Sequence, residues 1–229
     1  VEVERSLKVL DGAVALFSAR AGVQTQSEKV WKQATKFNVP RICFVNKMDI
    51  NDANFLKVVA NMKERLGANV VPVQLPIGEA ETFKGFVDLI KMKAYVFYDD
   101  LGKDVREEEI PANIADEVAE YRNALIEAVA ETDEVLMEKY LEGEELSYDE
   151  IMTGLRSATI ANQIVPCICG SSYKNKGVQQ MINGVVAFLP SPLDIPAIKG
   201  ITLDGEEDSR ESSDQAPMAA LAFKIATDP

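Results

Sequence analysis

The chain has 229 residues, of which 37 are acidic and 24 are basic, so its formal net charge is −13. It contains no histidine, which excludes Ser-His and Cys-His nucleophilic catalysis as well as a histidine-based metal centre. No apolar run reaches the roughly 18 residues that a membrane-spanning helix needs, so the sequence predicts no membrane span.

The N-terminal part of the chain alternates between two kinds of segment. Residues 12–18 and 41–45 are largely apolar runs that predict buried strands, and residues 23–37 and 53–66 have the apolar spacing of helices. This alternation is typical of an α/β domain built on a parallel sheet.

A polar motif, Asn46-Lys47-Met48-Asp49, directly follows the second of these strands. Ligands of open parallel sheets bind at the carboxyl ends of the strands, which is where this motif is expected. A carboxylate at Asp49 can accept hydrogen bonds from guanine N1–H and from the 2-amino group, and adenine lacks this pair of donors. The Asn46 amide can reach guanine N7, the Lys47 stem can lie across the purine, and Met48 acts as a spacer. As the alternative interpretation, Asn and Asp are common in ordinary turns and helix caps.

The next strand of the alternating pattern does not begin until Ile164, so a separate α+β subdomain is expected in between. Residues 70–76 and 85–90 predict strands, and residues 93–98 and 104–110 predict a hairpin. Helices are expected from Pro111 onward and over residues 133–141 and 147–161, the last beginning with the capping-box pattern of Ser147 and Glu150.

This predicted insertion carries most of the acidity of the chain. Between Asp99 and Glu150 there are 19 acidic and 4 basic residues. Such a surface repels nucleic-acid phosphates, so direct RNA contact through it is not expected, and a basic protein partner fits it better. The alternative is a solvated helical face that keeps the protein soluble.

A second strand that ends in a loop returns the chain to the parallel sheet. Residues 164–169 predict a buried strand, residues 170–177 a tight Gly/Ser turn, and residues 178–189 a helix. The turn, with Ser171 and Ser172, can present a backbone N–H to guanine O6.

The three cysteines, Cys43, Cys167 and Cys169, lie in predicted core strands and are too few for a disulfide framework. A metal site at Cys167-x-Cys169 is an alternative, but no histidine and no second thiol pair is present to complete it.

The C-terminal part has a different composition. Pro190, Pro192 and Pro196 predict an extended connector, and a polar acidic loop follows. Residues 218–225 have the composition of one more strand, but this strand has no sheet to join, so we expect it to be disordered or to pair with another segment.

Four segments together resemble elongation factor G, the GTPase that drives translocation on bacterial and organellar ribosomes. They are residues 1–13 (VEVERSLKVLDGA), 22–28 (GVQTQSE), 44–49 (FVNKMD) and 170–177 (GSSYKNKG). The resemblance implies a partial P-loop-GTPase-type parallel sheet with an α+β insertion and the beginning of a β-barrel domain. The implied parts are the G-domain core (1–68 and 161–190), the acidic insertion (69–160), a linker (191–216) and the first strand of the barrel (217–229).

The resemblance also implies a function. The intact protein would be cytoplasmic, bind GTP or GDP with Mg²⁺, act on the large ribosomal subunit with its stalk proteins near the insertion, and move transfer RNA and messenger RNA. The base would be bound by Asn46, Lys47, Met48, Asp49, Ser171 and Ser172.

One departure from the family limits this expectation. The chain has no Gly-x-x-x-x-Gly-Lys-Ser/Thr segment and no Asp-x-x-Gly-His segment, which in the family hold the phosphates and supply the catalytic histidine. We therefore expect an internal piece of such a GTPase, without catalytic residues or Mg²⁺ ligands and inactive alone. The alternatives are a stand-alone module that holds a basic partner through the acidic insertion, and a nucleotide-binding enzyme outside the GTPases.

Overall fold

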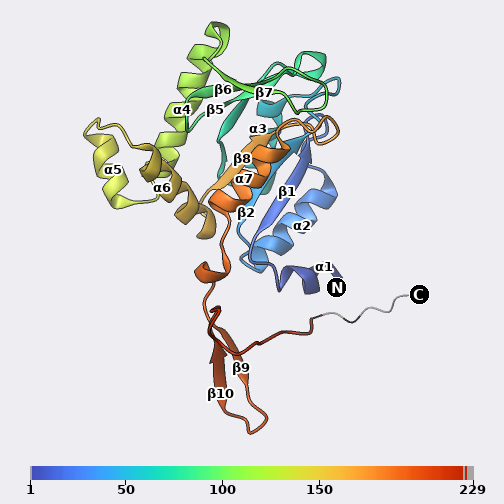
Figure 1. Cartoon of the computed structure of the whole chain (residues 1–229), viewed down its shortest axis with the longest axis vertical. Coiled ribbons are helices and arrows are strands. Elements are labelled where there is room, and N and C mark those ends of the chain that lie inside the picture. Colours follow the sequence, from blue (N-terminus) through green and yellow to red (C-terminus); the bar gives the residue numbers. More distant parts are fainter. Residues whose placement is uncertain (1, 224, 226–229) are drawn as a thin grey trace.

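The structure is a computed structural model that describes residues 2–223 and 225. Figure 1 shows a central sheet flanked by helices, a second sheet with its own helices beside it, and a hairpin that extends away from both. The helices in the described part of the chain are too short or too polar to cross a membrane.

The central sheet is parallel and mixes distant parts of the sequence. Its strand order is β1 (Ala13–Ser18), β2 (Arg41–Asn46), β8 (Val165–Cys169) and β3 (Val70–Pro72). The inner strands β2 and β8 are buried almost throughout, which explains why their sequences are apolar without alternation. This confirms the expected α/β fold with a parallel sheet.

Helices cover both faces of this sheet. α2 (Thr25–Lys36) packs beside α3 (Phe55–Leu66), and α6 (Tyr148–Ile160) packs beside α7 (Val178–Phe188) against β2 and β8. A shorter helix, α1 (Glu2–Leu7), contacts α2. Local sequence sets the helix ends: the Asn54 side chain accepts the Lys57 N–H at 2.8 Å before α3, and Gly67 ends that helix at φ 59°.

The predicted boundary between core and insertion is wrong at one strand. Residues 70–76 were expected to belong to the insertion, but β3 pairs with β8 in the parallel sheet, with Val70 opposite Val165. Only the following strand, β4 (Gln74–Ile77), begins the second sheet. A short apolar run does not specify which sheet it joins, because strands of both sheets are buried here.

The insertion is an antiparallel sheet with three helices. Its strands β4, β5 (Gly85–Asp88), β6 (Lys93–Phe97) and β7 (Val105–Glu108) pair in sequence order, which confirms the predicted hairpin. Short 3₁₀ turns occur at Ala80–Thr82 and, after Pro111, at Ala112–Ile114. The helices are α4 (Ala115–Ala130), α5 (Glu134–Leu141) and α6, and the predicted capping box of Ser147 and Glu150 is present at the start of α6.

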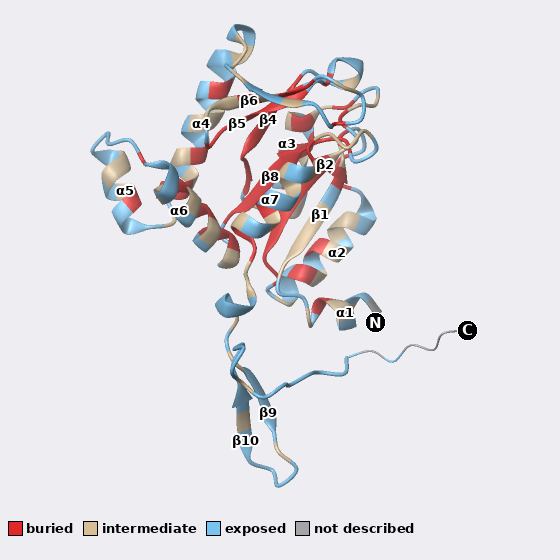
Figure 2. Cartoon of the chain, in the orientation of Figure 1, coloured by how far each residue is buried: buried red, intermediate tan, exposed pale blue. Residues whose placement is uncertain are grey.

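The two sheets share one hydrophobic core. Phe44 of β2, Phe86 of β5 and Leu125 of α4 are fully buried members of the same cluster. Figure 2 shows buried strands in both sheets. The insertion is therefore packed onto its host, so a displacement of one part is felt by the other.

The linker region differs from the sequence expectation, which was an extended connector and a polar loop. The predicted linker contains a short turn, Pro192–Asp194, and a two-stranded antiparallel hairpin of β9 (Ile198–Ile201) and β10 (Glu207–Arg210) that is mostly exposed (Figure 2). Asp204-Gly205, with Gly205 at φ 85°, is the turn signal that the polar composition obscured.

The predicted barrel strand over residues 218–225 does not form in residues 218–223 and 225, while 224 and 226–229 lie outside the described residues. An isolated strand has no neighbour to which its backbone groups can bond.

Candidate nucleotide-binding site

The two predicted base-binding segments follow adjacent parallel strands and lie side by side. In the sheet, Val45 of β2 is opposite Cys169 of β8, and the Gly170 N–H donates to the Val45 carbonyl at 3.0 Å. Asn46 and the turn at residues 170–177 therefore leave the same edge of the sheet together. Sequence alone predicted this proximity because both segments come directly after buried strands.

Asn46 connects the two loops through its side chain. Its Oδ1 accepts hydrogen bonds from the Lys47 N–H at 2.7 Å and from the Ser172 N–H at 2.9 Å, and its Nδ2 donates to Ser172 Oγ at 2.8 Å. The second Nδ2 hydrogen has no protein partner among the described residues, so it is available to an acceptor such as guanine N7.

The rest of the motif divides its roles between backbone and side chain. Lys47 is exposed and has a left-handed backbone at φ 66°, which turns the chain so that Met48 points inward and Asp49 does not. The Asp49 carboxylate is half-buried and makes no hydrogen bond or ion pair with any residue that the structure describes, so both of its oxygens can accept.

Met48 does more than space the motif. Its side chain is fully buried, its N–H donates to the Gly170 carbonyl at 3.1 Å, and its carbonyl accepts from the Ala80 N–H at 2.9 Å. Met48 thus fixes the motif to the second loop and to the insertion. Both bonds join backbone atoms, so the side-chain pattern of the sequence holds no signal that could have predicted this anchoring.

The second loop is closed by backbone hydrogen bonds. The Ser171 N–H donates to the Lys176 carbonyl at 2.8 Å, and the Lys176 N–H donates back to the Ser171 carbonyl at 2.9 Å. At Gly170 a Cβ atom would lie 2.9 Å from Phe44 Cζ and overlap the Lys176 carbonyl, so only glycine fits. Ser171 is buried within the turn and Ser172 is exposed.

Sequence reasoning expected the turn to present a backbone N–H to a base. Here the Ser172 N–H donates to Asn46 Oδ1, so a bound base would share this donor with Asn46. The Ser172 hydroxyl, which accepts from Asn46 Nδ2, adds a contact that the sequence did not predict.

The three cysteines are buried thiols. Burial raises the pKa of Cys43 to about 12 and also raises the pKa values of Cys167 and Cys169 above their ordinary range. Thiols of this kind stay protonated and pack as small hydrophobic groups, which favours the core interpretation over a metal site.

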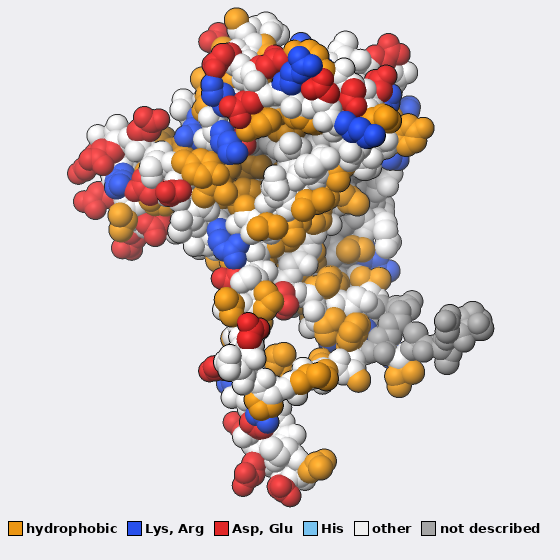
Figure 3. Space-filling model, viewed as in Figure 1, with side chains coloured by type: hydrophobic (Ala, Val, Ile, Leu, Met, Phe, Trp, Pro, Cys, Tyr) orange, Lys and Arg blue, Asp and Glu red, His pale blue; other side chains and the backbone are white. Residues whose placement is uncertain are grey.

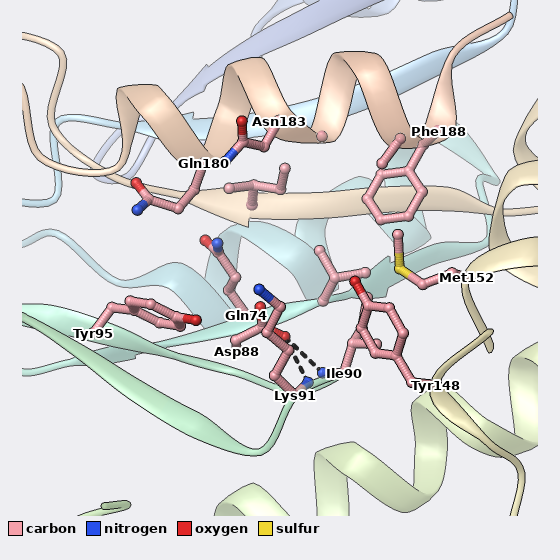
Figure 4. Close-up of a pocket in the computed structure, with 14 residues that line it drawn as sticks. Gln74, Asp88, Ile90, Lys91, Tyr95, Tyr148, Met152, Gln180, Asn183 and Phe188 are labelled. Atoms are coloured by element: carbon pink, nitrogen blue, oxygen red, sulfur yellow. Dashed lines mark hydrogen bonds between the residues drawn. The ribbon is translucent and has the colours of Figure 1, made fainter. Parts of the chain in front are cut away.

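A cavity of about 370 Å³ lies apart from both loops, between the second sheet, α6 and α7 (Figure 4). Asp88 lines it and holds the turn after β5, since Asp88 Oδ1 accepts the N–H of Ile90 at 2.8 Å and of Lys91 at 3.0 Å. Burial raises the pKa of this carboxyl, although the two N–H donors oppose the shift.

Parallel strands covered by helices, with two polar loops at their carboxyl ends, are typical of an α/β nucleotide-binding domain, and the arrangement is consistent with a fold of the P-loop GTPase type. The chain belongs to the family described as the elongation factor Tu GTP binding domain, whose profile matches residues 1–191. It is also similar to a solved crystal structure of a protein from Thermus thermophilus, with 30% identity and a TM-score of 0.76. That match covers 86% of this chain and 29% of the other one, so the chain spans less than a third of the solved protein.

Proposed function

We propose that this chain is the base-recognising part of a ribosomal translocation GTPase of the elongation factor G type. Asp49 accepts the two guanine donors, Asn46 donates to N7, Lys47 covers the purine face, and the turn at Ser171 and Ser172 donates to O6. The observation that carries the proposal is the set of hydrogen bonds between Asn46 and Ser172, which joins two loops 126 residues apart at one sheet edge.

The remaining parts of a GTPase reaction lie outside these residues. In the intact protein, GTP or GDP binds with Mg²⁺, and the metal offsets the negative charge of the phosphates. Asn46, Lys47 and Asp49 fit the base of such a nucleotide, and no residue of this chain is assigned to the metal. Because most nucleotide affinity comes from groups around the phosphates, the chain alone binds GDP weakly and does not hydrolyse GTP.

We assign the core and the insertion by the strands that each contains. The core consists of β1, β2, β3 and β8, and the insertion extends from β4 through α6. β1 is at the edge of the parallel sheet, so a further strand of a GTPase sheet would pair with the backbone groups on its outer side.

The acidic insertion is proposed to face a basic protein of the ribosomal stalk in the cytoplasm. Acidic side chains gather over α5 and near the β6–β7 hairpin (Figure 3). They include Glu134, Glu138 and Glu142, which are exposed on α5 and just after it. This surface repels RNA phosphates, so it does not contact ribosomal RNA directly.

The base assignment is tested by exchanging the acceptor at position 49. Asp49→Asn replaces one carboxylate oxygen with an N–H₂ donor, which mismatches the guanine 2-amino group and matches the 2-carbonyl of xanthine. Ligand-detected saturation-transfer NMR with GDP, ADP and xanthosine diphosphate measures all three affinities on the 229-residue chain. We expect the native chain to prefer GDP and Asp49→Asn to prefer the xanthine nucleotide. An unchanged preference in the variant would contradict the assignment.

A further inference from the structure

The insertion contacts both base-binding loops through its backbone. The Ala80 N–H, in the turn after β4, donates to the Met48 carbonyl at 2.9 Å. On the other side, the tip of the β6–β7 hairpin lies against the turn at residues 170–177, where the Asn175 Nδ2 donates to the Leu101 carbonyl at 3.4 Å. Two points of the insertion thus touch the two halves of the candidate site.

Gly102, at the tip of the β6–β7 hairpin, has no room for a side chain. Gly102 has φ 64°, and a Cβ atom there would lie 3.0 Å from the Lys174 carbonyl oxygen and overlap the Asn175 carbonyl oxygen. Both neighbours are backbone atoms of a turn closed by the Ser171 and Lys176 hydrogen bonds, so they cannot move aside alone. An added methyl group therefore displaces the whole turn or the hairpin tip.

A displaced turn changes the base-binding groups directly. Ser172 is three residues before Asn175 in the same turn, and the Asn175 N–H donates to the Ser172 carbonyl at 3.2 Å. Ser172 in turn holds the Asn46 amide through two hydrogen bonds. The chain of contacts from the insertion to Asn46 is therefore continuous: Gly102, Asn175, Ser172 and Asn46.

We propose that Gly102 is a positioning residue for guanine recognition, through which the inserted hairpin sets the placement of Ser172 and Asn46. This inference rests on the proposed guanine function for its effect on affinity, but the positioning itself is independent of any ligand. A partner that moves the hairpin would change the geometry of the base site from outside it.

Gly143 provides a matched control within the insertion. It has φ 76°, so alanine there carries the same left-handed backbone strain as alanine at position 102, but a Cβ atom at Gly143 meets nothing within 4 Å. Both variants, Gly102→Ala and Gly143→Ala, therefore carry the same backbone strain. Only Gly102→Ala adds a steric clash with the turn at residues 170–177.

The experiment has two stages on the ¹⁵N-labelled chain. Without nucleotide, we expect Gly102→Ala to shift the Ser172 backbone amide and the Asn46 side-chain amide signals, and Gly143→Ala to leave both in place. With GDP, we expect the dissociation constant of Gly102→Ala to rise on the order of tenfold, as for one lost hydrogen bond, with Gly143→Ala unchanged. The ADP affinity is the reference for base-independent effects.

Each outcome decides a separate statement. Unshifted Ser172 and Asn46 signals in Gly102→Ala overturn the positioning role, and shifted signals with unchanged GDP affinity overturn its effect on recognition. A native chain that binds GDP no better than ADP overturns the proposed function and leaves the first stage valid. If Gly102→Ala does not fold, Asn175→Gly takes its place, because it removes the bond to Leu101 and tolerates the φ of 52° at that position.

Discussion

Replacing Asn46 with alanine is expected to weaken the junction between the two loops. The substitution removes three hydrogen bonds, those to the Lys47 N–H, the Ser172 N–H and Ser172 Oγ. A net hydrogen bond contributes about 0.5–1.5 kcal/mol, and groups released into water regain partners, so the lower half of that range applies. The expected loss in free energy of unfolding is therefore about 1.5–3 kcal/mol.

Urea denaturation followed by the fluorescence of Trp31 measures this loss. Trp31 is the single tryptophan, is 7% exposed, and stacks under the Arg41 guanidinium at 4.3 Å, so its emission reports on the folded core. Asn69→Ala is the control, because it removes one exposed bond, from Asn69 Nδ2 to the Gln163 carbonyl at 3.1 Å. We expect Asn69→Ala to cost about a third as much as Asn46→Ala.

A double-mutant cycle isolates the bond across the loops. Ser172→Ala removes only the hydroxyl that accepts from Asn46 Nδ2, so its cost in the Asn46→Ala background should be smaller than in the native chain. Equal unfolding midpoints for Asn46→Ala and the native protein, or strictly additive costs in the cycle, would refute the reasoning that these bonds hold the loops together.

Three further predictions concern the insertion. Asp88→Asn keeps an acceptor for the turn and removes a carboxylate whose pKa is raised by burial. Urea titrations should therefore find the variant more stable than the native chain at neutral pH. The difference in free energy of unfolding should shrink as the pH falls toward 3.8, where the native carboxyl becomes protonated in both states. Leu125→Ala leaves a cavity in the core beside α4 and should lower the free energy of unfolding by about 2–5 kcal/mol in the same assay. A loss under about 1 kcal/mol would contradict the shared core. Hydrogen bonds from Lys139 and Ser147 lower the pKa of Glu150 to about 2. Their stabilisation is present above pH 4.5 and lost as pH falls toward 2, so the disadvantage of Glu150→Gln should shrink over that window.

Sequence patterns predicted the local structure and the meeting of the two loops. The helix that begins after Asn54, the capping box at Ser147 and the hairpin of β6 and β7 depend on residues close in the chain, so their signals are local. Asn46 and Ser172 could be placed together because parallel strands share one carboxyl edge.

The features that the sequence did not predict, which are the pairing of β3 and two backbone contacts, have a different origin. Whether β3 pairs with β8 or with β4 depends on shape complementarity across the whole core, which no short run encodes. The anchoring of Met48 by Ala80 and the contact of Gly102 with Asn175 join backbone atoms, which carry no side-chain signature in the sequence. A glycine in a predicted hairpin turn indicates a turn and does not reveal what lies against it.

The position of β8 between β2 and β3 also sets an order for folding. The antiparallel strands β4 to β7 pair with sequence neighbours and can form as soon as they are synthesised. The parallel sheet, in contrast, cannot close until Val165–Cys169 leaves the ribosome and enters between strands made much earlier. Until then one edge of β2 is open to pairing with the wrong strand, so a nascent chain that stalls before Val165 has an unpaired strand edge that favours aggregation.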